Sequence, residues 1–176
     1  MKIINSFKFF VLCSAIAGFA FTSCDDDDDN DNEVSAVYVG EYPGTLTLSG
    51  EMKGVQMFSG TTEGEFVISN AKDGFVDITV PEIDDFNARN TVYDVEDFVI
   101  TDVTVTADGD GYVFTKESFE VEGVKCDIGG AGDKEYLTTG SLTGTYKDGI
   151  LTVNYDFTLG SMPFPLVGSF EGKISK

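Results

Sequence analysis

The sequence predicts an all-β domain built as an antiparallel meander, and three features of the chain predict it. Turn signals recur at short intervals, apolar and polar residues alternate between them, and no stretch shows a sustained 3.6-residue apolar period. Many short strands joined by sequential hairpins close into a barrel or pack as a sandwich. We expect about eight to ten strands within residues 34–176, a length typical of one domain.

The clearest predicted strand is 151–159. Its apolar positions alternate with Thr and other polar residues, which is typical of an antiparallel strand with one buried face. In a closed barrel that face points inward. The inward-facing residues are then Leu151, Val153, Tyr155, Phe157 and Leu159.

Hairpins follow from the turn signals. Asp148-Gly149 predicts a hairpin between 136–146 and 151–159, because both residues tolerate positive φ. The same reasoning pairs 65–70 with 75–80 and 98–106 with 111–116, and it leaves 45–48, 55–58, 118–121 and 164–171 as further strands. Residues 81–96 are the least regular, and the glycines of 122–134 predict a mobile loop.

Aromatic and glycine residues recur within the predicted strands. We expect the phenylalanines of strand-like runs to be core residues: Phe75, Phe98, Phe114, Phe157 and Phe170. Several glycines lie at strand ends or inside strands, where bends and bulges let a sheet curl: Gly50, Gly60, Gly64, Gly140, Gly144 and Gly168.

Three segments carry a resemblance to a known family. The runs 42–48 (YPGTLTL), 144–153 (GTYKDGILTV) and 170–173 (FEGK) resemble the calycin-like (lipocalin-like) β-barrel domain of bacterial surface lipoproteins. The resemblance implies an antiparallel barrel, often with an interior cavity. True lipocalins carry a Gly-x-Trp signature on their first strand, and this chain has no Trp, so no lipocalin binding residue is carried over.

The first 24 residues have the layout of a lipoprotein signal. Lys2 and Lys8 precede an uncharged apolar run over 9–21, too short to span a membrane, and small residues then lead to Cys24. This arrangement resembles the lipobox of bacterial lipoproteins, although Phe21 stands where that family prefers Leu. The resemblance implies a diacylglycerol on the Cys24 thiol and removal of residues 1–23. An ordinary signal peptide with an incidental cysteine is the alternative.

An unbroken acidic run follows, formed by Asp25, Asp26, Asp27, Asp28 and Asp29. Like charges in a block repel and extend, so residues 24–33 are expected to be a flexible tether in front of a barrel domain over 34–176. The run also resembles the acidic export signal of surface-exposed lipoproteins in Gram-negative bacteria, which implies an outer-membrane anchor facing the cell exterior. A calcium loop is disfavoured, because the run lacks spaced ligands and a turn glycine.

Charge and composition exclude several functions. Without residues 1–23, 9 basic side chains face 31 acidic ones, a net charge of −22 that disfavours nucleic-acid binding. The chain has no His and, beyond Cys24, only Cys126, so His-dependent catalysis and zinc sites are excluded, and no cofactor motif is present. Cys126 is expected to be a small, partly buried residue without a disulfide.

Three functions remain open. We favour a non-catalytic binding module whose interior, lined by the apolar face of 151–159, takes a small apolar or amphipathic ligand. A structural or adhesive protein with a filled barrel is the second hypothesis. A carboxylate-based glycan hydrolase is the third, and the acids that could serve it are Asp84, Asp85, Asp94, Glu96, Asp97, Glu120 and Glu122. A hollow interior would favour the first hypothesis and a filled one the second.

Overall fold

The chain folds into ten β-strands in the residues that the computed structural model describes, which are 36–53, 55–88 and 91–175. The strands are β1 (Gly40–Met52), β2 (Val55–Lys72), β3 (Phe75–Val80), β4 (Ile83–Ala88), β5 (Thr91–Val95), β6 (Phe98–Asp108), β7 (Gly111–Ile128), β8 (Lys134–Lys147), β9 (Ile150–Leu159) and β10 (Leu166–Lys173). No helix long and apolar enough to cross a membrane occurs in these ranges. The prediction of an all-β fold is confirmed.

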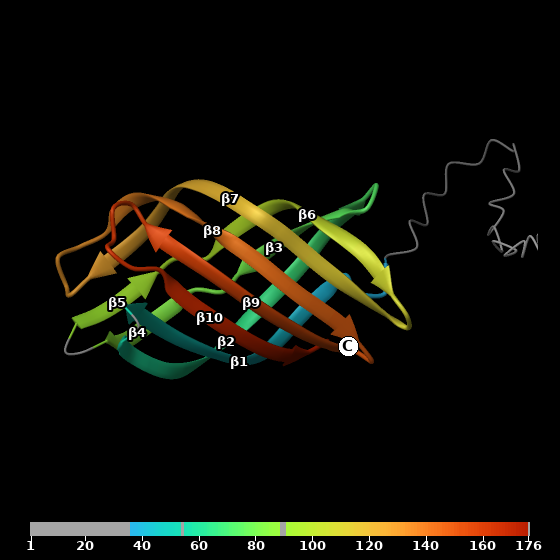
Figure 1. Ribbon diagram of the computed structural model, residues 1–176, viewed down its shortest axis with the longest axis horizontal. Helices are drawn as coiled ribbons and strands as arrows, with labels where there is room; N and C mark the ends of the chain where they lie inside the picture. Colours follow the sequence, from blue (N-terminus) through green and yellow to red (C-terminus); the bar gives the residue numbers. More distant parts are fainter. Residues whose placement is uncertain (1–35, 54, 89–90, 176) are drawn as a thin grey trace, which may run out of the picture. The chain divides into compact units, whose positions relative to one another are not determined.

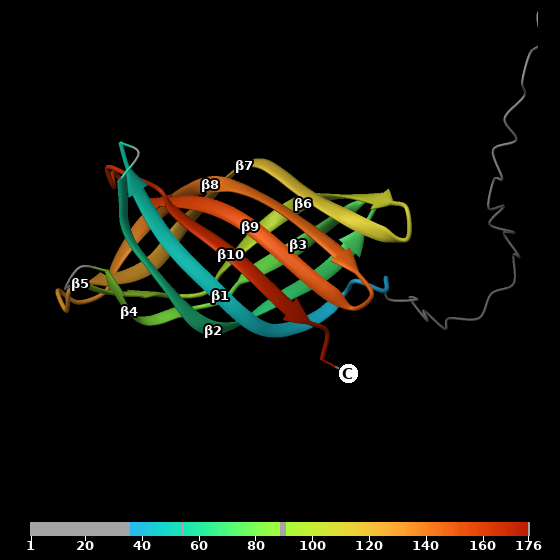
Figure 2. The same ribbon diagram turned by 60° about the horizontal axis from the view of Figure 1, so that its bottom comes forward.

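Eight strands close into an antiparallel barrel. Their order is β7-β6-β3-β2-β1-β10-β9-β8, and β8 pairs again with β7 (Figure 1). The first and last strands meet in register from Gly44↔Gly172 to Gly50↔Leu166. Figure 2 shows β8, β9, β10, β1 and β2 side by side in one wall. The prediction of an antiparallel meander closed into a calycin-like barrel is therefore confirmed.

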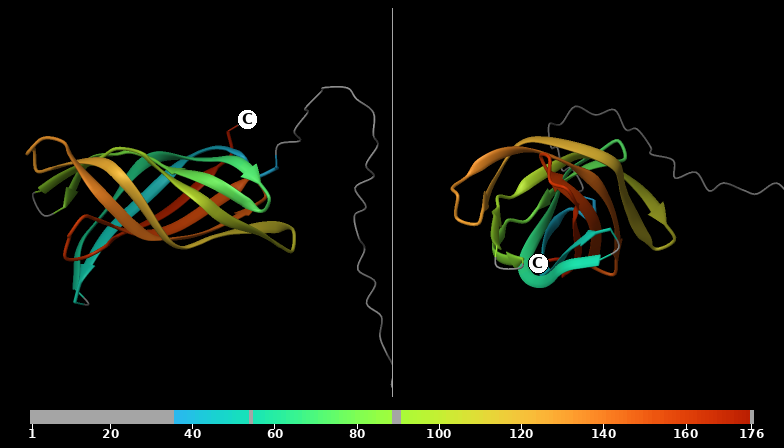
Figure 3. Two further views of the ribbon diagram at one scale, coloured as in Figure 1. Left: turned by 90° about the horizontal axis from the view of Figure 1, so that it is seen from above. Right: turned by 60° about the vertical axis from the view of Figure 1, so that its left-hand side comes forward.

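The two remaining strands lengthen one hairpin of this barrel. The β3–β6 ladder ends at Val80↔Phe98, and the β4–β5 ladder resumes at Ile83↔Val95. β5 then pairs with the end of β7, so β4 and β5 take over the wall at the end of the barrel drawn on the left in Figure 1. Figure 3 shows the strands wrapping around a common axis. The stretch expected to be least regular, 81–96, thus contributes two strands.

Two predicted hairpin turns have the expected backbone. Asp73 and Gly74 have φ of 53° and 83°, and Asp148 and Gly149 have φ of 53° and 80°. Positive φ at both central residues matches the right-handed twist of the flanking strands. The predicted pairings of β2 with β3 and of β8 with β9 are confirmed.

Three segments that were predicted to interrupt or separate strands are instead part of long, continuous strands. Segments 55–58 and 65–70 belong to one strand, β2, and 118–121 lies inside β7. The loop expected at 122–134 shrinks to 129–133, because β7 pairs with β8 as far as Cys126↔Lys134. Bulges in β7 absorb the extra residues, so ladder pairing with a long neighbour overrides the local glycine signal.

Candidate functional site

The inner face of β9 lies where the sequence predicted it. Its five apolar residues, named above as the predicted ligand-binding face, point into the core and are at most 2% exposed. A cavity wide enough for a water molecule would leave accessible area on the side chains that line it. These side chains therefore contact protein atoms on all sides, and ligand binding by this face stays a prediction that requires them to rearrange.

Aromatic rings fill the space that interior glycines leave. A Cβ added at Gly168 would overlap the Tyr155 ring, and one at Gly172 would lie 2.5 Å from the Phe170 ring. Phe66 continues this cluster, with its ring centroid 4.5 Å from that of Phe170. Aromatic residues and glycines thus alternate on the inner wall, and the rings occupy the space beside the glycines. A small barrel fills its own interior in this way. The predicted role of such glycines, to let the sheet bend, did not include this packing role.

Aromatic clusters also lie at both ends of the barrel. At one end, the Tyr38 ring packs on Tyr112 at 4.6 Å between centroids, and the Tyr42 hydroxyl donates to the Tyr38 carbonyl at 2.6 Å. At the other end, Phe58 packs on Phe86 of β4 at 5.5 Å. Aromatic packing therefore continues to both ends of the barrel.

Two buried hydroxyls in this interior have no hydrogen-bond partner. They are the Tyr155 phenol and the Thr138 hydroxyl. Burial raises the pKa of Tyr155 above its ordinary value, so the phenol stays protonated and its donor is unused. An unpaired buried polar group costs about 1–3 kcal/mol.

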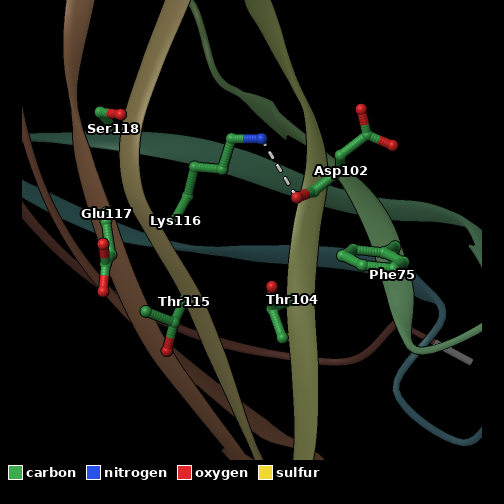
Figure 4. Close-up of a pocket in the computed structure, with 7 residues that line it drawn as sticks. All are labelled: Phe75, Asp102, Thr104, Thr115, Lys116, Glu117 and Ser118. Atoms are coloured by element: carbon green, nitrogen blue, oxygen red, sulfur yellow. Dashed lines mark hydrogen bonds between the residues drawn. The ribbon is translucent and has the colours of Figure 1, made fainter.

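The outer wall carries a depression of ≈540 Å³ between β3, β6 and β7. Figure 4 shows its residues. The Lys116 side chain extends from β7 across the gap between β6 and β7 toward the main chain of β6. The Lys116 ammonium donates to the Asp102 carbonyl at 3.1 Å. The lining residues are Phe75, Asp102, Thr104, Thr115, Lys116, Glu117 and Ser118.

Two bulges create this depression. Asp102 has φ of 53° at a register shift between β3 and β6, and its N–H donates to the Asp77 carboxylate at 3.3 Å. On β7 the register against β8 shifts between Lys116 and Phe119. The β6–β7 ladder ends at Thr104↔Thr115, next to both bulges. A bulge bends its strand and re-aims side chains, so β6 and β7 diverge here.

Phe75 is an exception among the predicted core phenylalanines. Phe98, Phe114, Phe157 and Phe170 are buried, whereas Phe75 is 44% exposed at the edge of the depression. The reason is the period of two along a strand: Val76 points inward, so Phe75 must point outward. The prediction that Phe75 is a core residue is wrong, and the alternation of 76, 78 and 80 was the signal that could have corrected it.

The acids proposed for a hydrolase have structural partners or face solvent. The Asp94 carboxylate accepts from the Asp85 N–H at 2.6 Å, and Glu96 forms an ion pair with Lys125 at 3.0 Å. No cluster of three metal-ligating side chains occurs in the described ranges. Cys126 is buried and forms no disulfide, and burial raises the pKa of its thiol to about 11. No observation favours catalysis, and the absence of enzyme activity stays a prediction.

The predicted lipidation and export residues lie outside the described residues. These are Cys24 and the run from Asp25 to Asp29, together with the predicted signal peptide 1–23 and tether 24–33. The described ranges all fall within the predicted domain 34–176.

One solved structure is similar to this barrel. It comes from Bacteroides fragilis NCTC 9343 and is described as a "putative outer membrane protein"; the TM-score is 0.52 at 22% identity. The match covers 77% of this chain and 50% of that one, so this chain spans about half the length of that protein. No protein-family model matches the chain, and no curated protein is significantly similar to it. The likeness shows a shared fold, and the closed eight-stranded barrel fits the architecture that the calycin-like resemblance implies.

Proposed function

We propose that this protein is a lipid-anchored outer-membrane lipoprotein that binds its partner through the outer wall of the barrel and catalyses no reaction. Cys24 carries the lipid in this proposal, and Asp25 to Asp29 direct the barrel to the cell exterior. The signal-like front of the sequence supports this location, and so does the similarity to a protein described as a "putative outer membrane protein".

The filled interior is the observation that carries the outward-facing role. Core side chains from β1, β2, β8 and β9 have no exposed area, among them Leu46, Phe66, Leu142 and Phe157. A ligand at these side chains would have to displace them, at a cost in packing energy. The outer wall, by contrast, has a preformed depression with exposed polar and aromatic groups.

Uptake of a fluorescent fatty acid tests this role. The full-length Cys24→Ala variant should stay unlipidated and soluble without detergent, so that no micelle competes for the probe. We expect no saturable uptake, because the five inward side chains of β9 are at most 2% exposed. Saturable uptake with a midpoint at low micromolar probe would contradict the outward-facing role if a bulky substitution inside the barrel abolishes it.

A ligand inside the barrel is the second candidate, and the unpaired Tyr155 hydroxyl favours it. A small amphipathic molecule could supply the missing partner if neighbouring side chains moved. In that case Val153→Trp, which adds bulk inside, should abolish uptake of the probe, while Asn154→Trp on the outer face should not. Equal uptake by the two variants would place the probe outside the barrel.

Anchoring is tested separately in a Gram-negative host grown with labelled fatty acid. Wild-type protein should carry the label, and Cys24→Ala should lose it. Replacing Asp25 to Asp29 by Ala should keep the label but protect the barrel from protease added to whole cells. An unlabelled wild-type protein would overturn the lipid anchor, and equal protease sensitivity would reduce the acidic run to a linker.

A further inference from the structure

We propose that the depression between β3, β6 and β7 binds a neutral carbohydrate chain, with Phe75 as its stacking platform. The proposal rests on the outward-facing role proposed above and adds the ligand class and the residues that recognise it. Four properties of the depression point to this chemistry: an exposed ring, hydroxyl groups on its floor, a donor with unused capacity, and the lack of a dominant charge.

Phe75 supplies a flat apolar surface at the rim. Phe75 is 44% exposed, because the alternation along β3 directs its side chain outward. The face of an aromatic ring is negative, and the C–H bonds on one face of a sugar ring are weakly positive. A sugar can therefore stack on Phe75 while its hydroxyls point toward the polar floor.

The floor can both donate and accept hydrogen bonds. Thr104 and Thr115 lie directly opposite each other across β6 and β7, and each hydroxyl is one donor and two acceptor sites. Asp102 and Glu117 add carboxylate acceptors. Lys116 has three N–H donors, of which the structure uses one, toward the Asp102 carbonyl. A polyhydroxylated ligand satisfies donors and acceptors together.

Charge argues for a neutral ligand. The chain has a formal net charge of −20, which repels anions. Within the depression the Lys116 ammonium reaches toward the Asp102 carbonyl, so a cationic ligand would meet a like charge there (Figure 4). A neutral ligand avoids both penalties.

A row of uncharged polar residues leads out of the depression around the barrel. Directly opposed residues connect all eight barrel strands in one row, and its members after Phe75 carry a hydroxyl or an amide and no charge. The row is Phe75, Thr104, Thr115, Thr143, Asn154, Ser169, Thr47 and Thr61. With strands about 4.8 Å apart, Thr143 and Asn154 extend the polar track by about 10 Å beyond Thr115. This continuation favours a chain of sugars over a single sugar.

Affinity electrophoresis of the full-length protein in mild detergent tests the proposal. The probes are dextran, yeast mannan and galactomannan as neutral chains, with polygalacturonate as the anionic counterpart. We expect retardation by at least one neutral chain and none by polygalacturonate. Phe75→Ala should weaken that retardation about tenfold. Lys116→Met should weaken it severalfold, and Lys116→Arg should restore most of it.

Leu137→Ala is the matched control, because Leu137 is 45% exposed on β8 and lies outside the row. It should bind like wild type. Retardation by none of the neutral chains, or by polygalacturonate alone, would overturn the carbohydrate proposal. Equal binding by Phe75→Ala and wild type would overturn the site. Either result leaves the outward-facing role standing, since that role fails only if the fatty-acid probe enters the barrel.

Discussion

The two sides of the barrel differ in how regularly their strands pair. From β8 through β9 and β10 to β1, the ladders run without a register shift. On the other side, shifts occur between β1 and β2, β2 and β3, β3 and β6, β4 and β5, and β7 and β8. Asn70, Asp85 and Asp102 have positive φ inside or beside those strands.

This difference suggests a division of roles, in which the regular side stabilises the fold and the irregular side binds the ligand. The regular side has ladders without a register shift and buries the best-defined apolar face of the chain, so it should contribute most to stability. The irregular side has two bulges that turn the Asp102 carbonyl and the β7 side chains into the depression. Bulges are typical of places where a sheet re-aims side chains. The following predictions test this division, from the largest expected effect to the smallest.

The same substitution on the two sides should have very different effects. Phe157→Ala removes a fully buried ring that packs on Tyr155 and Phe98, so it should lower the free energy of unfolding by about 3–5 kcal/mol. Phe75→Ala removes an exposed ring and should change it by less than about 0.5 kcal/mol. Urea unfolding of the full-length protein measures both. A comparable loss in the two variants would contradict the division.

Adding one methyl group on the regular side should also destabilise the fold. The Cβ of Gly168→Ala would overlap the Tyr155 ring, and the tightly packed core resists a shift of that ring. We expect a loss of about 1–3 kcal/mol in the free energy of unfolding. Ser169→Ala, its exposed neighbour on β10, is the control and should be nearly neutral. A neutral Gly168→Ala would reveal spare space beside Tyr155 and revive the internal cavity.

Removing an unpaired hydroxyl should stabilise the protein. Tyr155→Phe keeps the ring in place and eliminates the buried phenol that has no partner, so the free energy of unfolding should rise by about 1 kcal/mol. Thermal unfolding followed by circular dichroism detects the gain. A clear loss of stability instead would mean that the hydroxyl has a partner in solution.

Protonation of the Cys126 thiol should have the smallest effect on the free energy of unfolding near neutral pH. Burial, followed by the negative charge of Asp127, raises the pKa of its thiol to about 11, so the folded protein holds this proton more tightly than the unfolded chain. The resulting stability is fully present below the unfolded thiol's pKa of about 9 and is lost as pH rises toward about 11. At pH 8, iodoacetamide should label the folded thiol about 100-fold more slowly than the unfolded one. Equal rates would show that the end of the barrel at β5 opens freely.

The alternation of residues predicted much of the fold and part of the site. The alternation from Leu151 to Leu159 predicted both a strand and its buried face, and Asp148-Gly149 predicted the turn before it. The same period of two in 76–80 already placed Phe75 on the outside. The depression itself was not predictable, because it depends on bulges at Asp102 and Lys116 whose positions follow from pairing with β3 and β8.

The sequence by itself determined the all-β class, the strand faces and the hairpin turns, because these depend on residues close together in the chain. Only the tertiary structure decided in which register the first and last strands close the predicted barrel, that Gly168 makes room for Tyr155 and that 81–96 extends the wall. Those outcomes depend on contacts between distant strands, such as β1 with β10, and a local pattern of side chains carries no information about register between them. Whether an inward face lines a cavity or a packed core depends on the interior volume that the side chains have to fill. That volume is set only when all eight strands close the barrel.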